Sequence, residues 1–291
     1  PPITPTTPGV TQTEKLLIDT GSQASAGTQA GSVGQAIRNA YQLVQGPQVS
    51  QNGVFFSSRN DPSQVRDVDF WFSVGGNKFT GIAEGNGYDL SMGVQASFTP
   101  SLTAGVALSY NNLELISTAG KLEVEGLIAG PYFNYTAGAL TFNGYALYGE
   151  TDYDLNGATA EGDRLIYGLT ASMQIDRASM SISPYVSVSG YSESIGALGA
   201  APAKDVDQAS LGLGARIDFT SVQNMNPYLV VGVDAWQFDD GLTTTSEITP
   251  RIGAGVQMPV GNGSVSIDFS AAEVAKDLTQ VNVGIRYNLK F

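Results

Sequence analysis

The sequence contains no cysteine and no histidine. Without cysteine there is no disulfide framework, no thiolate metal site and no nucleophilic or redox-active thiol. Charged residues are also scarce, because they make up 14% of the chain where soluble domains contain about 25%. The net charge is −13, which argues against a nucleic-acid partner, since phosphate binding requires clustered Lys and Arg.

Long apolar runs are missing as well. Although 42% of the residues are hydrophobic, no segment approaches the roughly 18 uncharged apolar residues of a membrane-spanning helix. A helical membrane protein is therefore excluded. The chain begins Pro1-Pro2-Ile3 without the basic and apolar segments of a secretory signal peptide. We expect that a signal peptide was removed or that the chain is the C-terminal piece of a longer precursor.

The first part of the chain divides into two segments. Residues 1–22 are rich in Pro, Thr, Gly and Ser and predict an extended linker to a missing domain. Residues 23–46 contain no Pro, and their larger apolar residues recur at helical spacing: Val33, Ile37, Tyr41 and Val44. The other residues are mostly small and polar, so this helix suits a narrow polar channel. The alternative is a flexible spacer with little helix.

From residue 68 to the end, apolar and polar residues alternate with a period of two, which predicts strands with two different faces. We predict twelve strands, at residues 68–77, 87–99, 102–115, 121–136, 139–154, 162–176, 179–194, 206–221, 226–239, 245–260, 263–273 and 279–291. The alternation is clearest in 87–99. Other strands are less regular and offer aromatic inner-face candidates: Tyr145, Tyr185 and Trp236.

The polar face of these strands consists mainly of Gly, Ser, Asn and Gln. A soluble β-sandwich also alternates, but its outer face usually carries Lys and Glu. Small polar residues instead suit a wet lumen that leaves room for a helix, and closure of the sheet pairs every backbone group within the bilayer. The sequence therefore predicts an all-β membrane protein, a 12-stranded antiparallel transmembrane β-barrel with an N-terminal α-helix in its lumen.

Turn lengths predict the orientation. Outer-membrane barrels have short periplasmic turns and longer external loops. Even-numbered strands are followed by short turns, and odd-numbered strands by longer stretches such as 78–86, 155–161 and 195–205. With an even strand count, the first strand starts on the periplasmic side, as the last strand ends there. The helix must then run through the pore and leave the N-terminus outside the cell.

The segment 47–67 is a periplasmic link in this prediction. It contains the apolar run Val54-Phe55-Phe56, so it is either a loop or a short extra strand. A full extra strand would make the count odd and weaken the orientation argument.

The last strand carries a specific pattern. Its odd-numbered residues from Val281 to Phe291 are apolar and its even-numbered residues are polar or Gly. This ending resembles the signal that the barrel-assembly machinery of the outer membrane reads, because an unpaired edge strand can recruit a partner through its backbone. The residues of this predicted assembly signal are Asn282, Gly284, Tyr287, Leu289 and Phe291.

Residues 23–291 resemble the translocator domain of autotransporters, the proteins of type Va (type V) secretion in Gram-negative bacteria. The resemblance rests on the pore helix, the twelve strands, the first strand Val68-Asp69-Phe70-Trp71-Phe72-Ser73, the entry Gly85-Asn86-Gly87-Tyr88-Asp89 and the ending Gly284-Ile285-Arg286-Tyr287. It implies a monomer in the cell outer membrane that supports protein transport of its own N-terminal passenger domain. The implied partners are outer-membrane lipid, the barrel-assembly machinery and periplasmic chaperones.

Candidate site residues follow from these assignments. The pore helix offers Val33, Ile37, Arg38, Asn39 and Tyr41. Some members of this family cut their passenger at an Asn in the helix, but Asn39 lacks the paired-Asn motif of that subgroup, so we interpret it as a polar helix residue that is hydrogen-bonded in the lumen. The charges expected to point into the lumen, and to pair there with opposite charges, are Asp69, Arg216, Asp218, Arg251, Asp268 and Arg286.

We predict no catalytic activity, no cofactor and no metal site. The outer-membrane barrel enzymes resemble one another in relying on histidine, which this chain lacks. Acidic residues in the expected external loops show no EF-hand spacing. The alternative function is a stand-alone outer-membrane porin or solute channel in which residues 1–46 are a periplasmic tail. The passenger, its cleavage and the organism are not encoded in these residues.

Overall fold

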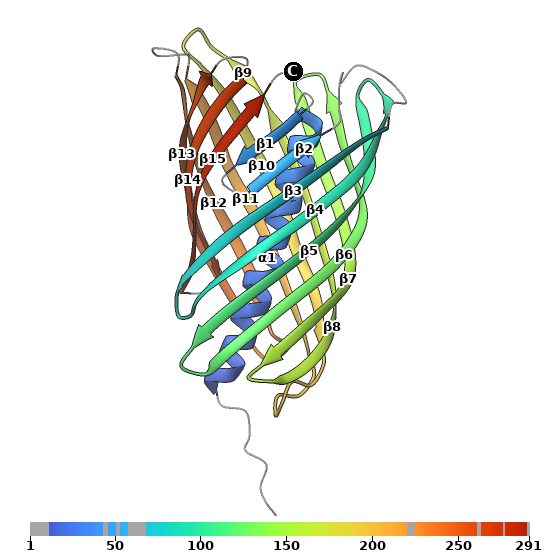
Figure 1. The fold of residues 1–291 in the computed structure, drawn as a ribbon, viewed down its shortest axis with the longest axis vertical. Coiled ribbons are helices and arrows are strands. Elements are labelled where there is room, and N and C mark those ends of the chain that lie inside the picture. Colours follow the sequence, from blue (N-terminus) through green and yellow to red (C-terminus); the bar gives the residue numbers. More distant parts are fainter. Residues whose placement is uncertain are drawn as a thin grey trace, which may run out of the picture.

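The computed structural model describes residues 12–42, 46–50, 53–57, 68–219, 225–260, 263–275 and 277–289. A single helix, α1 (Gln12–Gln42), lies inside a curved sheet and follows its long axis (Figure 1). Within the described residues, no helix has the length and apolar character needed to cross a membrane.

Over the described residues the sheet contains fifteen strands, of which twelve are long and antiparallel. Their bounds are β1 (Gly46–Ser50), β2 (Gly53–Ser57), β3 (Val68–Gly81), β4 (Glu84–Thr99), β5 (Leu102–Ser117), β6 (Gly120–Ala137), β7 (Leu140–Leu155), β8 (Ala158–Met173), β9 (Ile175–Asp176), β10 (Met180–Ile195), β11 (Lys204–Phe219), β12 (Asn226–Asp239), β13 (Thr244–Val260), β14 (Gly263–Ala275) and β15 (Leu278–Leu289). The three short strands are β1, β2 and β9.

The strands close into a ring. Each long strand pairs with its neighbour in sequence, and β15 pairs with β3 from Leu278 opposite Gly81 to Val281 opposite Lys78. Beyond that point the short β1–β2 hairpin lies between β15 and β3. The predicted 12-stranded antiparallel barrel with an N-terminal helix in the lumen is confirmed.

Two boundaries differ from the sequence prediction. The helix begins at Gln12, so residues 12–22 belong to the helix and not to a linker. Leu17 and Ile18 of this segment bury their side chains against the barrel wall. Residues 1–11, the rest of the predicted linker, lie outside the described residues. The segment 47–67 contains two short strands rather than a single loop or one extra strand. A pair of strands leaves the parity of the strand count unchanged.

The long loops expected at 78–86 and 155–161 are absent, because the strands continue and are joined by two-residue turns. Asn156 and Gly157 adopt left-handed backbone angles, with φ of 55° and 89°, as tight hairpin turns require. The connection at 196–203 does remain a loop. The helix begins at the end of the barrel that carries these three connections, at the bottom of Figure 1.

The outward face carries an apolar band. In β8 it runs from Leu165 to Met173, about the 9–11 residues of a transmembrane strand. Large exposed apolar side chains continue this band around the barrel: Met92, Val94, Leu127, Phe133, Leu169, Val186, Val188, Leu211, Leu213, Val231, Val233 and Ile252. Tyr145, Tyr185 and Trp236 belong to the opposite, inward phase of their strands.

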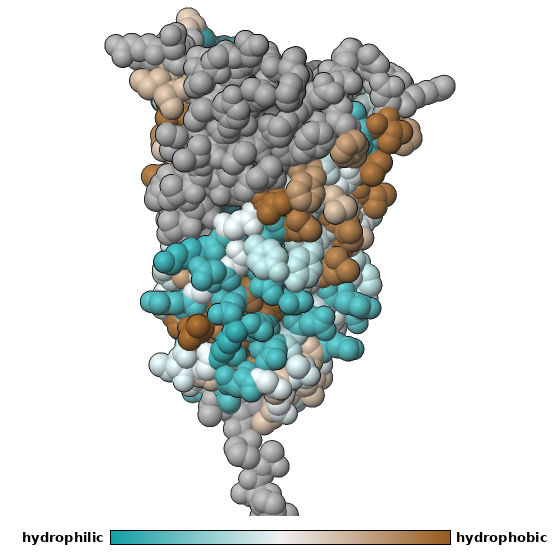
Figure 2. All heavy atoms as spheres, in the orientation of Figure 1, coloured by the Kyte–Doolittle hydropathy of each residue, from teal (hydrophilic) through white to brown (hydrophobic). Residues whose placement is uncertain are grey.

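The alternation inverts at the end where α1 begins, a region that we call the collar. There the inward residues are apolar and buried: Leu113, Leu115, Leu122, Val124, Leu155, Ile195, Val206, Trp236, Phe238 and Leu278. The outward residues are charged: Glu114, Lys121, Glu123, Asp152, Glu161, Asp163, Asp205 and Asp207. Figure 2 shows hydrophilic residues over this lower part of the molecule and hydrophobic ones higher up. The collar is therefore built like a soluble barrel around the helix.

Candidate functional site: the lumen and its helix

Small residues let the helix approach the wall. Its buried face includes Ser22, Ala24, Ser25 and Ala26, and α1 packs mainly against β5 and β6. A Cβ atom placed on Gly21 would lie 2.3 Å from Cδ2 of Leu122. A larger residue at that point would require the side chain of Leu122 to shift.

A buried ion pair holds the middle of the helix. Arg164 of β8 and Glu193 of β10 both have side chains with 0% exposure, and the guanidinium donates to both carboxylate oxygens at 2.9 and 3.1 Å. The same guanidinium donates to Oγ of Ser25 at 2.9 Å and to Oε1 of Gln29 at 3.2 Å. The wall charge is thus bonded directly to the helix.

The carboxylate of Glu193 is satisfied from several directions. It accepts hydrogen bonds from Ser22 of the helix at 2.6 Å and from Thr151 of β7 at 2.8 Å. A buried ion pair offsets the cost of its desolvation only when the remaining hydrogen-bonding positions are filled. Arg164, Glu193 and their partners, which we call the clamp, meet most of that condition, largely through residues of the helix, while Nε of Arg164 is buried without a partner among the described residues.

Further hydrogen bonds follow the helix toward its C-terminal end. Asn111 donates to Oγ of Ser25 at 2.7 Å, and Tyr145 donates to the backbone carbonyl of Ala30 at 3.1 Å. The hydroxyl groups of Tyr41 and Thr136 lie 2.6 Å apart. Polar wall residues therefore contact the helix along most of its length.

Two ion pairs fix the start of the helix to the collar. Lys15 lies 2.7 Å from Asp240 in the β12–β13 turn, and Lys204 of β11 pairs with Asp19. Burial alone would raise the pKa of Asp240, but hydrogen bonds from Lys15 and from the backbone of Thr243 and Leu242 outweigh it and lower that pKa below its ordinary range. The hydrogen bond with Asp240 correspondingly raises the pKa of Lys15.

The predicted pore-helix residues occupy different environments. Val33 and Ile37 are buried, and Arg38 donates to Gln35 of its own helix at 3.1 Å. Tyr41 contacts the wall through Thr136, as described above. Asn39 lies in α1, but its side chain is outside the described part of the structure.

The predicted lumen charges do not form one cluster. Arg216 pairs with Asp218 of the same strand at 2.7 Å and stacks over the ring of Tyr228. Arg251 pairs at 2.8 Å with Asp234, a partner that the sequence did not suggest. Asp69 is buried near the start of β3. For Asp268 and Arg286 only the backbone is described, in β14 and β15.

The sequence prediction missed Arg164 and Glu193. Arg164 points inward together with the apolar, buried Ile166. The rule that apolar side chains face lipid would turn Ile166 outward, and Arg164 with it. Its alternation with the outward Leu165 was the only local signal. Pairing with Glu193 depends on the β8–β10 register, which places the two residues opposite each other.

The predicted assembly signal lies in β15 and, for Phe291, beyond the described residues. Asn282 is opposite Ser270, Gly284 opposite Asp268, Tyr287 opposite Val265 and Leu289 opposite Gly263. These residues therefore form regular pairs with β14.

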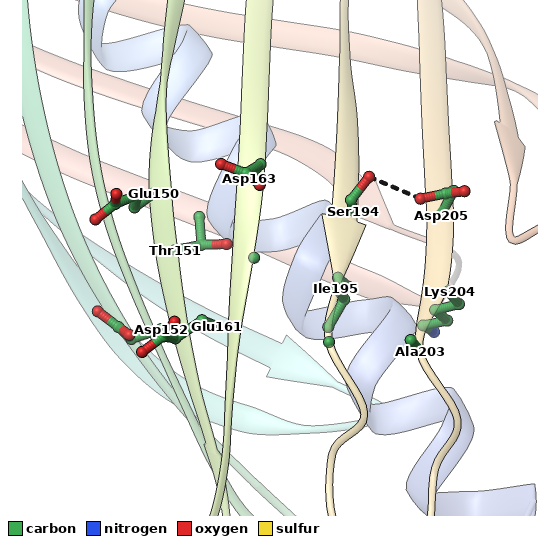
Figure 3. A pocket seen from close by; sticks show the side chains of 12 residues that line it. Glu150, Thr151, Asp152, Glu161, Asp163, Ser194, Ile195, Ala203, Lys204 and Asp205 are labelled. Carbon is green, nitrogen blue, oxygen red and sulfur yellow. Dashed lines mark hydrogen bonds between the residues drawn. The ribbon is translucent and has the colours of Figure 1, made fainter.

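The outer surface of the collar has one concave region of about 730 Å³ across β7, β8, β10 and β11. Glu150, Asp152, Glu161, Asp163 and Asp205 line it (Figure 3). Ser194 donates to Asp205 at 2.7 Å. In the ranges that the structure describes, no group of three or more acidic residues is arranged to hold a metal ion.

The sequence and the fold were compared with known proteins. The sequence model described as "Autotransporter beta-domain" matches residues 70–290, whereas no curated protein matches the chain. The fold is similar to the translocator domain of autotransporter NalP from Neisseria meningitidis, with a TM-score of 0.60, 14% identity and coverage of 93% of this chain and 98% of that one.

Two further solved structures are similar. The beta domain of the Bordetella autotransporter BrkA has a TM-score of 0.57 and 16% identity, covering 76% of this chain and 98% of that one. The transport unit of the autotransporter AIDA-I from Escherichia coli has a TM-score of 0.51 and 12% identity, covering 91% and 99%.

Proposed function

The chain belongs to the autotransporter beta-domain family and is an outer-membrane translocator for passenger export; we propose that α1 is the segment that stays in the pore, plugs it and anchors the passenger. The observation that carries this proposal is the clamp. A fully buried arginine and glutamate form hydrogen bonds with Ser22, Ser25 and Gln29 of the helix. A wall built to be completed by the helix fits a resident helix rather than a passing one.

The collar supports an orientation with the N-terminus outside the cell. Charged side chains such as Glu123, Glu161 and Asp163 cover the outward face of the collar, and charges are costly against lipid. The apolar band must therefore lie in the bilayer and the collar beyond it. The short turns 100–101 and 138–139 lie at the opposite end, as periplasmic turns do.

The partners that we propose follow from this placement. The apolar band contacts outer-membrane lipid, and the passenger continues from the start of α1 at the collar. The barrel-assembly machinery would recognise β15, whose ending carries the predicted signal, after periplasmic chaperones deliver the chain. We propose no enzymatic activity for the domain.

A stand-alone porin remains the competing function. In a porin the lumen would have to conduct, whereas here α1 fills much of it and hydrogen bonds link helix and wall from Ser22 to Tyr41. A porin precursor would encode only a signal peptide before Pro1, and a translocator precursor would encode a long passenger.

Deleting the helix tests the plug. We expect the barrel without residues 12–42 to conduct much more strongly in planar bilayers than the complete chain. A variant without residues 1–11 keeps the helix and serves as the matched control, with the conductance of the complete chain. Circular dichroism checks that each variant keeps its sheet. Equal conductance with and without the helix would contradict the plug.

A further inference from the structure

The helix fills the lumen unevenly. It packs against β3 to β8, β10 and β14. On the β4–β6 side, inward polar residues are sealed from solvent: Ser91, Ser109 and Asn134 are at most 1% exposed. The helix and this half of the wall therefore form a dry contact.

The opposite half of the wall is wet. Arg216 and Arg251 lie in the inward phase of β11 and β13, yet their side chains are 40% and 44% exposed. Arg38 of the helix is half-buried, and Tyr185, like Arg251, belongs to the inward phase of its strand, so these groups face the lumen. Inward side chains can be exposed only where water occupies the lumen beside them.

The face of α1 that carries Gly27 and Gly31 also indicates open space in the lumen. Gly27 and Gly31 are exposed although α1 lies inside the barrel, and a Cβ atom on either residue would meet no heavy atom within 4 Å. Open space therefore lies beside the helix at these two positions.

At the collar the same strands are closed. Val206, Trp236 and Phe238, which continue the inward phase of β11 and β12, are at most 6% exposed. Leu17 and Ile18 of the helix, at 3% and 2% exposure, belong to the same buried cluster. Within β11 alone, the inward side chains change from the exposed Arg216 to the buried Val206.

We infer that the pore is sealed at one level only, by the apolar packing of the collar around Leu17 and Ile18. Beyond the clamp, the space between α1 and β10–β13 is a water-filled vestibule that opens away from the collar. This inference rests on the proposed plug function and locates its barrier. Apolar constrictions block ions by excluding water, so the collar, in series with the vestibule, sets the conductance of the whole pore.

Matched pairs of aromatic residues test this location. Trp236→Ala with Phe238→Ala removes two rings from the collar, and Tyr185→Ala with Tyr228→Ala removes two rings from the vestibule. In planar bilayers, we expect the collar variant to conduct several-fold more than the complete chain and the vestibule variant to match it. Equal currents for the two variants would overturn the inference.

This result is separable from the plug itself. If deletion of residues 12–42 opens the pore while both aromatic variants conduct alike, the plug stands and the single-level seal is wrong. If the deletion does not open the pore, the proposed function fails first.

Cysteine labelling gives a second measurement that does not depend on conductance. Because the chain has no cysteine, single substitutions report one position each. In the purified folded protein, a charged methanethiosulfonate should label Gly31→Cys nearly as fast as Leu242→Cys, whose leucine is 80% exposed. Ile18→Cys should react roughly a hundred times more slowly, as groups that need local opening do. Labelling of Gly31→Cys as slow as that of Ile18→Cys would show that no vestibule exists.

Discussion

Replacing Arg164 by methionine should loosen the helix while leaving the barrel closed. The substitution removes a guanidinium that donates to Glu193, Ser25 and Gln29 and leaves the glutamate buried without its counter-charge. Breaking one side of a buried pair costs about 3–5 kcal/mol. Since the lost hydrogen bonds to Ser25 and Gln29 join wall to helix, much of this cost should appear in the opening of α1.

The expected loss of free energy can be measured as an increase in the rate of amide hydrogen exchange. At about 1.4 kcal/mol for each factor of ten, 3–5 kcal/mol accelerates exchange through helix opening by roughly a hundredfold to several thousandfold. Hydrogen exchange read by mass spectrometry resolves peptides from residues 12–42 separately from peptides of β5 and β6. We expect faster exchange in the former and little change in the latter.

Two controls isolate the buried pair. Arg164→Met with Glu193→Leu removes both charges and should restore most of the protection, because apolar pairs replace buried ion pairs at little cost. Lys121→Met breaks exposed pairs with Glu114 and Glu123 and should leave exchange unchanged. Unchanged exchange of the helix in Arg164→Met, or equal acceleration in helix and strands, would refute the role given to the clamp.

Three other substitutions probe the collar and the band. Gly21→Leu should weaken helix packing by about 1–3 kcal/mol through overpacking, seen as faster exchange of α1, whereas Gly27→Leu, in open space, should not. Because the pKa of Asp240 is lowered, its pair stabilises the fold above its ordinary pKa of about 4 and loses this effect as the pH falls further. At neutral pH the unmodified protein should therefore melt at a higher temperature than Asp240→Asn, and this difference should vanish in strong acid. A difference in melting temperature that stays constant with pH would contradict this. Leu169→Arg should destabilise the membrane-inserted barrel by about 2–4 kcal/mol in urea unfolding, while Thr159→Arg, on the outer face of the collar, should be tolerated; equal effects would misplace the band.

The barrel could be predicted from the sequence because one physical contrast, lipid against lumen, repeats along most strands. Leu211 and Leu213 show it plainly, since they are exposed on the outward face as their alternation with Ser210 and Gly212 indicates. In the collar the contrast reverses, so Glu161 indicated a loop although it lies on the outward face of β8. Single-strand patterns do not reveal which side water occupies.

The start of the helix and the clamp could not be predicted from short segments of sequence, because both depend on contacts between distant parts of the chain. Leu17 and Ile18 are too few to indicate an amphipathic helix, and they become buried only because the collar surrounds them. Arg164 and Glu193 lie 29 residues apart. Their pairing depends on the strand register and on a helix more than a hundred residues earlier, which composition and periodicity do not encode.

In the proposed orientation the N-terminus leaves the barrel on the cell surface, where a passenger would be carried. An epitope placed before Pro1, expressed behind a signal peptide, tests it most directly with protease added to intact cells. The account predicts that the epitope binds antibody on intact cells and is removed by the protease, while the barrel survives. An epitope that stays protected until the outer membrane is permeabilised would contradict the account and favour a porin with a periplasmic tail.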